Sequence, residues 1–569
     1  MTSVATRDWQ QILARHSFLE GDALERASAL LDPDSVAVLC GPFDRLESPW
    51  LVPQGIVPQA DDGVVIARGT LDGRPAVVAS IEQGFQGGGT GEVSGAKISQ
   101  ALRLAAEASR AGTPTAAVLL FETGGVRLQE ANLGLNAVAE ICSAVLDLRP
   151  MAPVIGLVAG EVGSFGGMSI AAGLCTRLII TPQGRIGLNG PAVIEQEAGI
   201  EEFDAADRAL IWSIDGGEQR AAIGLADKLV ADDRDLIRAA VMEAVTAGVP
   251  PAGSHRSERI DVLGSRLASF DPLNAPTPQD LRRLWGPKFE PVDGAKPAGA
   301  ATPSATASRG RLWLSALAGV EPVAVIPSVL RADTADATYL AVVPDPQNPF
   351  HRARNGEVGL TESWALAAAI DDVIASNTKR AIVAVVDLPS QAYGRIEEMA
   401  GVHQAIATTV DAYHRARNAG HPTVAIVVGH ALSGGFLAHG LQAQQILALD
   451  DPGVEIHAMH KAAAARITLR TVDELDELAK TVVPLSYNVR DWAQLGLCDG
   501  LLKTSDADNP TADDITAVRQ AVNDAIAAAR SGPRDLSNRL DSPGALTNRK
   551  ASRAIRDAMS AQWQGTERP

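Results

Sequence analysis

Pairs of adjacent glycines stand at turns where backbone amides could bind an oxyanion. Gly124-Gly125 follows the apolar run 116–121, Gly166-Gly167 ends the segment SFGG, and Gly434-Gly435 ends the segment LSGG. The first N–H groups of a helix have no acceptor, and the missing side chains let a ligand oxygen approach them closely. Two such turns meeting at one edge of a sheet would stabilise a developing enolate or tetrahedral oxygen by about 3 to 4 kcal/mol per donor. The pattern therefore predicts an enzyme that acts on an acyl group and stabilises its carbonyl oxygen as negative charge develops.

Other side chains beside these turns are candidates for substrate contact. Arg127 could hold a carboxylate or phosphate through a bidentate contact, or form a surface salt bridge with Glu130. Lys97 could meet a phosphate, or lie on a helix surface. The further predicted substrate contacts are Gly87, Gly88, Gly89, Ser164, Phe165 and Ser433.

The two halves of the chain follow one plan, which argues that the glycine pairs do more than permit tight turns. Gly91-Glu92-Val93 and Gly356-Glu357-Val358 each open a helical pattern. From that start to the last glycine of the plan there are 76 residues in the first half and 79 in the second. The short apolar runs that predict buried strands are 116–121 and 153–160 in the first half, and 381–386 and 422–429 in the second. Strand–helix alternation predicts two α/β domains with parallel sheets and right-handed crossovers.

A segment poor in large apolar residues separates the two copies. Residues 291–309 read PVDGAKPAGAATPSATASR, which is typical of a flexible linker. We therefore predict a first domain over residues 1–290, the linker over 291–309, and a second domain over 310–530. The Arg-rich residues 531–569 are expected to form a helical tail that docks a partner or covers the fold.

Composition restricts the function further. The formal net charge of −18 disfavours nucleic acid as a partner. The four cysteines (Cys40, Cys142, Cys175, Cys498) lack metal-ligand or disulfide spacing, so we expect reduced thiols and no metal site. No stretch has the uninterrupted apolar length of a signal peptide core or a membrane span, so a cytoplasmic location without membrane association is expected.

Several segments resemble the carboxyltransferase subunits of acyl-CoA carboxylases, which belong to the crotonase-like (ClpP/crotonase) superfamily. The segment ETGGVRLQE (122–130) is similar to their DSGGARxQE motif, GGGTGEVSGAK (87–97) to their glycine-rich segment, and LERASALLDPDS (24–35) to their N-terminal helix. In the second half, VDLPSQAYGRIEE (386–398) and GHALSGGFLAHGL (429–441) resemble the gamma subunit of malonate decarboxylase. The chain thus resembles fused beta and gamma subunits of a biotin-independent malonate decarboxylase, with two crotonase-like domains in tandem.

This resemblance implies a reaction and a set of residues. An oxyanion hole would use Gly124, Gly125 and Val126 with Gly166 or Gly167, and a second hole would use Tyr393 or Gly394 with Gly434 or Gly435. In biotin-dependent relatives one hole holds the thioester enolate and the other the ureido oxygen of biotin. The implied reaction here is decarboxylation of malonyl-S-acyl carrier protein to acetyl-S-acyl carrier protein and CO2, which needs no metal or nucleophile once the enolate is stabilised.

The implied partners are an acyl carrier protein (the delta subunit) and an acetyl-S-ACP:malonate ACP transferase (the alpha subunit). The cofactor would be the CoA-derived, phosphopantetheine-type arm of the carrier, with no biotin bound to this chain, since the lysine of Ala458-Met-His-Lys461 is misplaced for biotinylation. Tyr393, Ser164 and His430 stand near the turns as candidate proton donors, although packing, capping and backbone hydrogen bonding explain them better. The sequence leaves homo-oligomerisation and malonyl-CoA as the substrate open.

Three other functions remain as alternatives. A biotin-dependent acyl-CoA carboxyltransferase would take biotin from a separate carrier, and a non-catalytic scaffold subunit would need no chemistry. A serine hydrolase would use Ser164 or Ser433, but neither serine lies in GxSxG. The motifs of a P-loop and of a dinucleotide fold are absent, which argues against nucleotide cleavage and hydride transfer.

Overall fold

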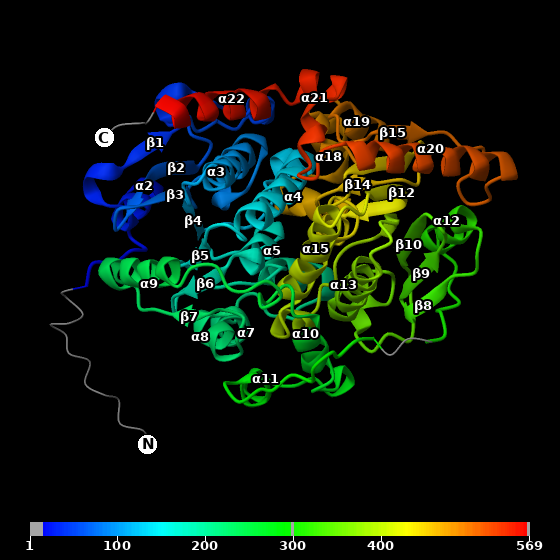
Figure 1. Ribbon diagram of the computed structural model, residues 1–569, viewed down its shortest axis with the longest axis horizontal. Coiled ribbons are helices and arrows are strands. Elements are labelled where there is room, and N and C mark those ends of the chain that lie inside the picture. Colours follow the sequence, from blue (N-terminus) through cyan, green and yellow to red (C-terminus); the bar gives the residue numbers. More distant parts are fainter. Residues whose placement is uncertain (1–14, 298–300, 566–569) are drawn as a thin grey trace.

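Two mixed β-sheets, one from each half of the chain, form the framework of the computed structural model, which describes residues 15–297 and 301–565 (Figure 1). The strands of the first sheet are, in spatial order, β1 (Ala37–Leu39), β2 (Val64–Leu71), β3 (Arg74–Ile81), β4 (Ala116–Phe121), β5 (Val154–Val158), β6 (Arg177–Ile180) and β7 (Lys228–Leu229). β1, β2 and β3 pair antiparallel, and β3 to β7 pair parallel.

The second sheet repeats this arrangement. Its strands are, in spatial order, β8 (Val323–Ile326), β9 (Val329–Asp333), β10 (Ala337–Val342), β11 (Ala381–Leu388), β12 (Thr423–Leu432), β13 (Gln445–Leu449) and β15 (Gly500–Leu502), and β14 (Ile456–His457) extends the end of β12. Again the first three strands are antiparallel and the following ones parallel. The two-copy α/β architecture is therefore confirmed.

The predicted strands match β4, β5, β11 and β12, but the expectation of purely parallel sheets is wrong. Each sheet begins with antiparallel strands, which the short apolar runs of the sequence did not predict. Asp72-Gly73 joins β2 to β3 with positive φ at both residues (51° and 73°), the conformation of a two-residue hairpin turn that Asp-Gly favours. The four cysteines are unpaired, as predicted.

Helices α3 (Glu92–Arg110) and α13 (Leu360–Ala375) are equivalent elements of the two halves. Their N-caps are Gly91 and Gly359, and each cap N–H donates to the side chain of the third helical residue. The second copy therefore starts at Gly359, three residues after the predicted Gly356.

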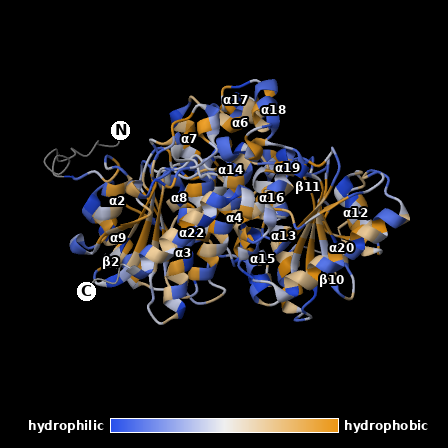
Figure 2. Ribbon diagram, turned by 90° about the horizontal axis from the view of Figure 1, so that it is seen from above, coloured by the Kyte–Doolittle hydropathy of each residue, from blue (hydrophilic) through white to orange (hydrophobic). Residues whose placement is uncertain are grey.

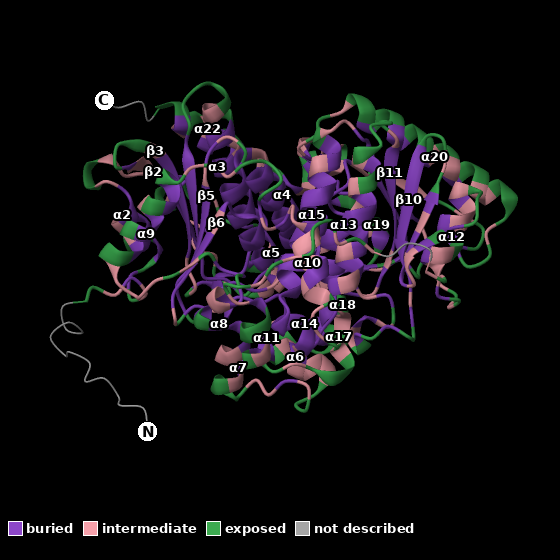
Figure 3. Ribbon diagram, turned by 60° about the horizontal axis from the view of Figure 1, so that its bottom comes forward, coloured by how far each residue is buried: buried purple, intermediate pink, exposed green. Residues whose placement is uncertain are grey.

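Four helices fill the space between the sheets: α4 (Ala131–Leu148) and α5 (Gly167–Leu174) from the first half, and α15 (Val402–Asn418) and α16 (Ser433–Ala438) from the second. They are buried almost throughout (Figure 3). The segment 128–148 around α4 is apolar and long enough to cross a membrane by composition, but 94% of its apolar window is buried inside the protein, as in a core helix. The apolar strands and the inner faces of these helices make one core across both halves (Figure 2).

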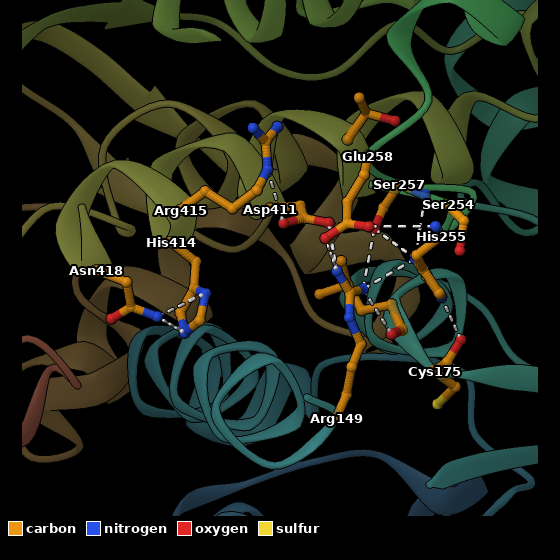
Figure 4. Close-up of polar contacts among 12 residues, drawn as sticks. Arg149, Cys175, Ser254, His255, Ser257, Glu258, Asp411, His414, Arg415 and Asn418 are labelled. Carbon is orange, nitrogen blue, oxygen red and sulfur yellow. Dashed lines mark hydrogen bonds and ion pairs between the residues drawn. The ribbon is translucent and has the colours of Figure 1, made fainter. Parts of the chain in front are cut away.

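A buried polar network also joins the two halves. Arg149, at the end of α4, binds the Asp411 carboxylate of α15 at 2.7 Å and contacts His255 and Ser257 (Figure 4). The guanidinium groups of Arg149 and Arg415 hold the pKa of Asp411 well below its usual range, although burial acts in the opposite direction. Breaking such a pair would leave an uncompensated buried charge.

Each half contributes a helix from its C-terminal part that packs on the other half. Helix α10 (Ile260–Leu267) packs on α13, where the Trp364 indole donates to the Ile260 carbonyl at 3.1 Å. The tail helix α22 (Lys550–Gly565) packs on α3, and its Arg556 binds the buried Glu140 of α4 at 2.5 Å. The tail therefore covers the first domain, which was one of its two predicted roles.

The outer faces of the sheets carry further helices. The first sheet is covered by α2 (Ala23–Leu30) and α9 (Arg234–Thr246), and the second by α12 (Arg309–Ala318) and α20 (Ala512–Ser531). The remaining helices used below are α6 (Pro191–Ala198), α14 (Arg395–Met399) and α17 (Lys461–Ile467). The predicted linker lies partly on residues 298–300, outside the described residues, and Ala301 pairs with Ala324 of β8.

Candidate active site

A cavity of about 320 Å³ lies between the two halves, where the turns after β4, β5, β11 and β12 meet. The predicted residues that line it are Gly87, Gly89, Gly124, Val126, Arg127, Gly166, Gly167, Tyr393, Ser433 and Gly434. Helices α6 and α17, one from each half, contribute Val193 and Ile467 to its wall. The carboxyl ends of the parallel strands are the usual place for a ligand site in an α/β fold.

In the first half, the two glycine turns are in close backbone contact. Thr123 and Ser164 form a parallel bridge that extends the β4–β5 pairing beyond the strands. A Cβ atom on Gly125 would lie 3.0 Å from the Gly166 Cα, so only glycine permits this approach. Both glycines also have positive φ, 109° and 56°.

The carboxylate that ends each central strand braces its neighbouring turn. Glu122 accepts the N–H of Gly160, and Asp387 accepts the N–H of His430 at 3.2 Å. Burial raises the pKa of Glu122 to about 7. Both carboxylates bind backbone rather than facing the cavity.

Among the predicted donors of the first half, two backbone N–H groups have no acceptor among the described residues. They belong to Val126, just after the first glycine pair, and to Gly167, the first residue of α5. Three other predicted donors are already committed: Gly124 donates to Gly87 O (3.0 Å), Gly125 to Thr123 Oγ1 (3.0 Å), and Gly166 to Leu188 O (2.8 Å). The first half thus presents one amide from each turn to the cavity.

The equivalent of Val126 in the second half is Gln391. Val126 forms a parallel bridge with Thr90, and Gln391 forms the same bridge with Val358 at the same place in the fold. The predicted donors Tyr393 and Gly394 therefore stand two and three residues too far along the chain, since Gln391 follows Asp387 by four residues just as Val126 follows Glu122. Gly394 caps α14 and does not line the cavity.

The equivalent of Gly167 is Gly434. The residue before each has a left-handed backbone, with φ of 56° at Gly166 and 58° at Ser433. Gly435 lies one residue beyond the equivalent position and does not line the cavity. A left-handed serine costs on the order of 1 kcal/mol, and such strain concentrates at functional sites.

One N–H of the second amide pair, that of Gly434, is occupied by the protein itself. Gln391 Oε1 accepts the Gly434 N–H at 2.7 Å, and Gln391 Nε2 donates to Asn189 Oδ1 at 2.7 Å. Both side chains are more than nine-tenths buried. Neither residue was predicted, because an isolated Gln or Asn carries no sequence signal; only the three-dimensional meeting of the halves identifies them.

The titratable side chains that line the cavity differ in whether they are free to contact a substrate. Tyr393 lines it, with its hydroxyl 3.4 Å from Ser433 Oγ, and burial raises the pKa of Tyr393. Arg127 lines it too, but its Nη1 binds Asp62 and Glu130, each at 2.8 Å, so the predicted ion pair with Glu130 is present but buried rather than on the surface. Among the described lining residues there is no cation without a carboxylate partner.

Four predicted substrate contacts do not line the cavity. Lys97 is buried, and its Nζ donates to the carbonyls of Asp61 (2.9 Å) and Val64, which contradicts both the phosphate and the surface interpretations. The others are Gly88, Ser164 and Phe165. Ser164 Oγ is buried without a hydrogen-bond partner, and neither Ser164 nor Ser433 is hydrogen bonded to a histidine, which removes the support for a serine hydrolase. His430 is exposed and faces Glu455.

A second cavity, of about 260 Å³, also lies between the halves, beside the Arg149 network. It is lined by Arg177, Arg256 and Arg266, among others, and by Gln404 of α15. None of the paired glycine turns contributes to it. The chemistry is therefore assigned to the cavity at the strand ends.

Comparisons with known proteins agree with this division into halves. Residues 22–288 match the carboxyl transferase domain, and residues 353–563 match the malonate decarboxylase gamma subunit. The chain is 43% identical over 226 residues to the malonyl-S-ACP:biotin-protein carboxyltransferase MADC of Malonomonas rubra, covering 38% of this chain and 71% of that protein. It is 35% identical over 158 residues to MADD of the same organism, covering 26% of this chain and about half, 54%, of that protein.

A solved structure is also similar. One chain of a Pseudomonas malonate decarboxylase hetero-tetramer in complex with malonate is 56% identical, with all of that chain and 49% of this one covered and a TM-score of 0.48.

Proposed function

The chain belongs to the malonate decarboxylase family of carboxyltransferases, and from this membership we propose that it converts malonyl-S-acyl carrier protein to acetyl-S-acyl carrier protein and CO2 without biotin. The observation that carries the proposal is the pair of unoccupied N–H groups, on Val126 and Gly167, in the cavity between the halves.

The first step is loss of the carboxylate. In the cavity the malonyl carboxylate meets no free cation, since the Arg127 guanidinium is held by Asp62 and Glu130. A carboxylate that has lost its water without gaining a counter-ion is destabilised relative to neutral CO2. The cavity lining therefore favours cleavage of the C2–carboxyl bond over a stable complex with the intact carboxylate.

The electron pair of that bond moves into the thioester, and the carbonyl oxygen becomes the enolate oxygen. The Val126 and Gly167 N–H groups donate to this oxygen. They are held in place before the reaction, because the glycine turns are locked by backbone bonds and by the Gly125–Gly166 contact. Donors of this kind need no reorganisation as charge develops.

The enolate must then take a proton at C2. We assign this proton to the Tyr393 hydroxyl, which stays protonated at neutral pH because burial disfavours the phenolate. Ser433 lies beside it, 3.4 Å away, and Ser433 Oγ bonds to the Ala458 carbonyl at 2.9 Å. After transfer, solvent reaching the cavity returns a proton to Tyr393, and the acetyl thioester leaves.

The substrate arm implies partners in a multi-subunit assembly. The Pseudomonas relative is part of a hetero-tetramer. We propose that this chain works with an acyl carrier protein, whose phosphopantetheine-type arm enters between α6 and α17, and with a transferase subunit that loads malonate, in the cytoplasm. Apolar lining residues such as Leu128, Leu437 and Met459 suit the thioester end of that arm.

A second candidate is transfer of the malonyl carboxyl group to a biotin protein. The names of both Malonomonas relatives favour it. The two candidates share the enolate step and differ in the fate of the carboxyl group.

The test uses malonyl-CoA and malonyl carrier protein labelled with ¹⁴C in the free carboxyl group. We expect the purified chain to release ¹⁴CO2 from the carrier-bound substrate with avidin present. Release that requires an added biotin protein would overturn the biotin-free proposal in favour of the second candidate. No turnover of either substrate under both conditions would overturn decarboxylation altogether.

A further inference from the structure

The orientation of the Gln391 carboxamide is fixed by its neighbours. The Ala392 carbonyl can only accept, so it must face Asn189 Nδ2, which lies 2.9 Å away. Asn189 Oδ1 must then accept, and it does so from Gln391 Nε2. The remaining atom, Gln391 Oε1, therefore faces the Gly434 N–H, as its distance of 2.7 Å indicates.

This carboxamide is also held from the other half of the molecule. Asn189 belongs to the first half, and its backbone N–H and Nδ2 both donate to Glu398 Oε1, at 2.6 and 2.9 Å. Glu398 in turn lies 3.9 Å from the buried Arg220 guanidinium, which binds Asp215 at 2.8 Å. A side chain fixed through so many buried contacts does not leave its place without a large cost.

The first half has nothing comparable. Val126, at the position equivalent to Gln391, has an apolar side chain that cannot accept a hydrogen bond, and the Gly167 N–H remains without an acceptor among the described residues. A Cβ on Gly434 would meet Gln391 Oε1 first, at 3.1 Å, which places the carboxamide oxygen directly over this amide. One fold thus carries an amide pair with both N–H groups open and an equivalent pair in which the Gly434 N–H is filled.

We propose that Gln391 is a built-in plug, whose carboxamide oxygen takes the place that the carbonyl of a second substrate would need. The inference rests on the proposed function for what the open site does, but the plug itself rests on the contacts of Gln391. With the second site closed, no acceptor carbonyl can be bound beside the thioester, and the carboxyl group leaves as CO2.

Biotin is the second substrate for which this proposal makes the most specific statement. Its ureido oxygen is a strong acceptor and would seek the same Gly434 N–H. The residues present do not fit it, because Gln391 already supplies the oxygen and Asn189 holds it there. The chain therefore differs in this property from what the names of its Malonomonas relatives state of those proteins.

The test replaces Gln391 by valine, the residue that the first half carries at the equivalent position. Binding of 2-imidazolidone, a bare ureido ring, is followed by ligand-observed NMR on the full chain. We expect at least a tenfold stronger signal change for Gln391→Val than for the unmodified chain. This measurement needs no turnover, so it separates failure of the plug from failure of the proposed reaction.

A second measurement follows the label of carboxyl-¹⁴C malonyl-CoA in the presence of free biotin. In Gln391→Val we expect part of the label to become acid-labile and bound to biotin, as the C2–carboxyl bond breaks, a bond from that carbon to the ureido nitrogen forms, and the nitrogen's proton ends on C2. In the unmodified chain all label should appear as CO2.

The matched control is Gln391→Glu, which keeps an acceptor oxygen over Gly434 and should stay closed to the ureido ring. Gln391→Ala replaces the valine variant if the latter loses its thermal transition. The proposal is overturned if folded valine and alanine variants bind the ring no better than the unmodified chain, or if the unmodified chain binds it as strongly as they do.

Discussion

The amide pairs of the two halves are built from the same bridge and follow the same left-handed residue, yet only the first pair leaves both N–H groups free. Val126 and Gly167 present two free N–H groups, whereas Gly434 is bound by Gln391 of its own half. Two residues after each turn donor, the first half has Leu128 and the second has Tyr393, and both line the cavity. Under the proposed function, one half receives the oxyanion and the other supplies the acid.

The comparison teaches that a single side chain decides what a repeated backbone can do. The backbone of both turns is fixed by bridges and small residues, so it changes little between the copies. The residue at position 126 or 391 differs between the halves, and both residues line the shared cavity. The following predictions alter one half toward the other.

The largest effect is expected for Val126→Gln, which carries the plug into the first half. A carboxamide oxygen over the Gly167 N–H would remove one donor from the enolate and fill its space. We expect kcat for malonyl carrier protein to fall by about 10² to 10³, the usual consequence of losing one such donor.

Val126→Leu is the matched control for size, as it adds bulk without an acceptor. If the glutamine and leucine variants lose activity equally, bulk rather than the hydrogen bond is responsible, and the comparison of the two halves fails.

Tyr393→Phe makes the second half resemble the apolar first half at this position. We expect kcat to fall by about 10² with little change in KM, because general acids typically contribute 10² or more and the ring itself is kept. Stopped-flow release of CO2 and product analysis would locate the loss after bond cleavage. An unchanged kcat, with an unchanged solvent isotope effect, would exclude Tyr393 as the donor.

The sequence predicted the site residues of the first half better than those of the second half, where Gln391 covers the Gly434 N–H. The strands around the first site and the glycine turns were found because apolar runs and Gly-Gly pairs are local signals. Lys97 was misassigned because its spacing gave no indication that two carbonyls, of Asp61 and Val64, would bury it. Gln391 could not be found, since its role exists only where Asn189 of the other half meets it.

A third prediction compares the carboxylates at the ends of β4 and β11. Burial raises the pKa of Glu122 to about 7, from 4.5 in an unfolded chain. Between these values the unfolded state loses the proton first, so the free energy of unfolding falls as pH rises from about 4.5 to about 7. Glu122→Gln cannot titrate and should reduce that fall by about 2 kcal/mol, within the limit of 1.36 kcal/mol per pKa unit.

Urea unfolding at pH 5, 6, 7 and 8 measures this difference, and Asp387→Asn is the positional match in the other half. A variant curve parallel to that of the unmodified chain across the window would show that Glu122 is not the group responsible.

The smallest effects are expected when a methyl group is added to each helix start. A Cβ on Gly167 would lie 2.8 Å from Val138 Cγ1 and 3.2 Å from Leu437 Cδ2, so Gly167→Ala should cost about 1 to 2 kcal/mol of stability by overpacking, and reduce kcat as the N–H moves. Gly434→Ala meets only the Gln391 carboxamide, at 3.1 Å. Its stability should change by less than about 1 kcal/mol, and its kcat should be nearly unchanged, because the second amide takes no part in holding the enolate. Thermal unfolding and CO2 release on the two variants make the comparison, and a Gly434→Ala variant as impaired in kcat as Gly167→Ala would mean that both amide pairs serve the reaction.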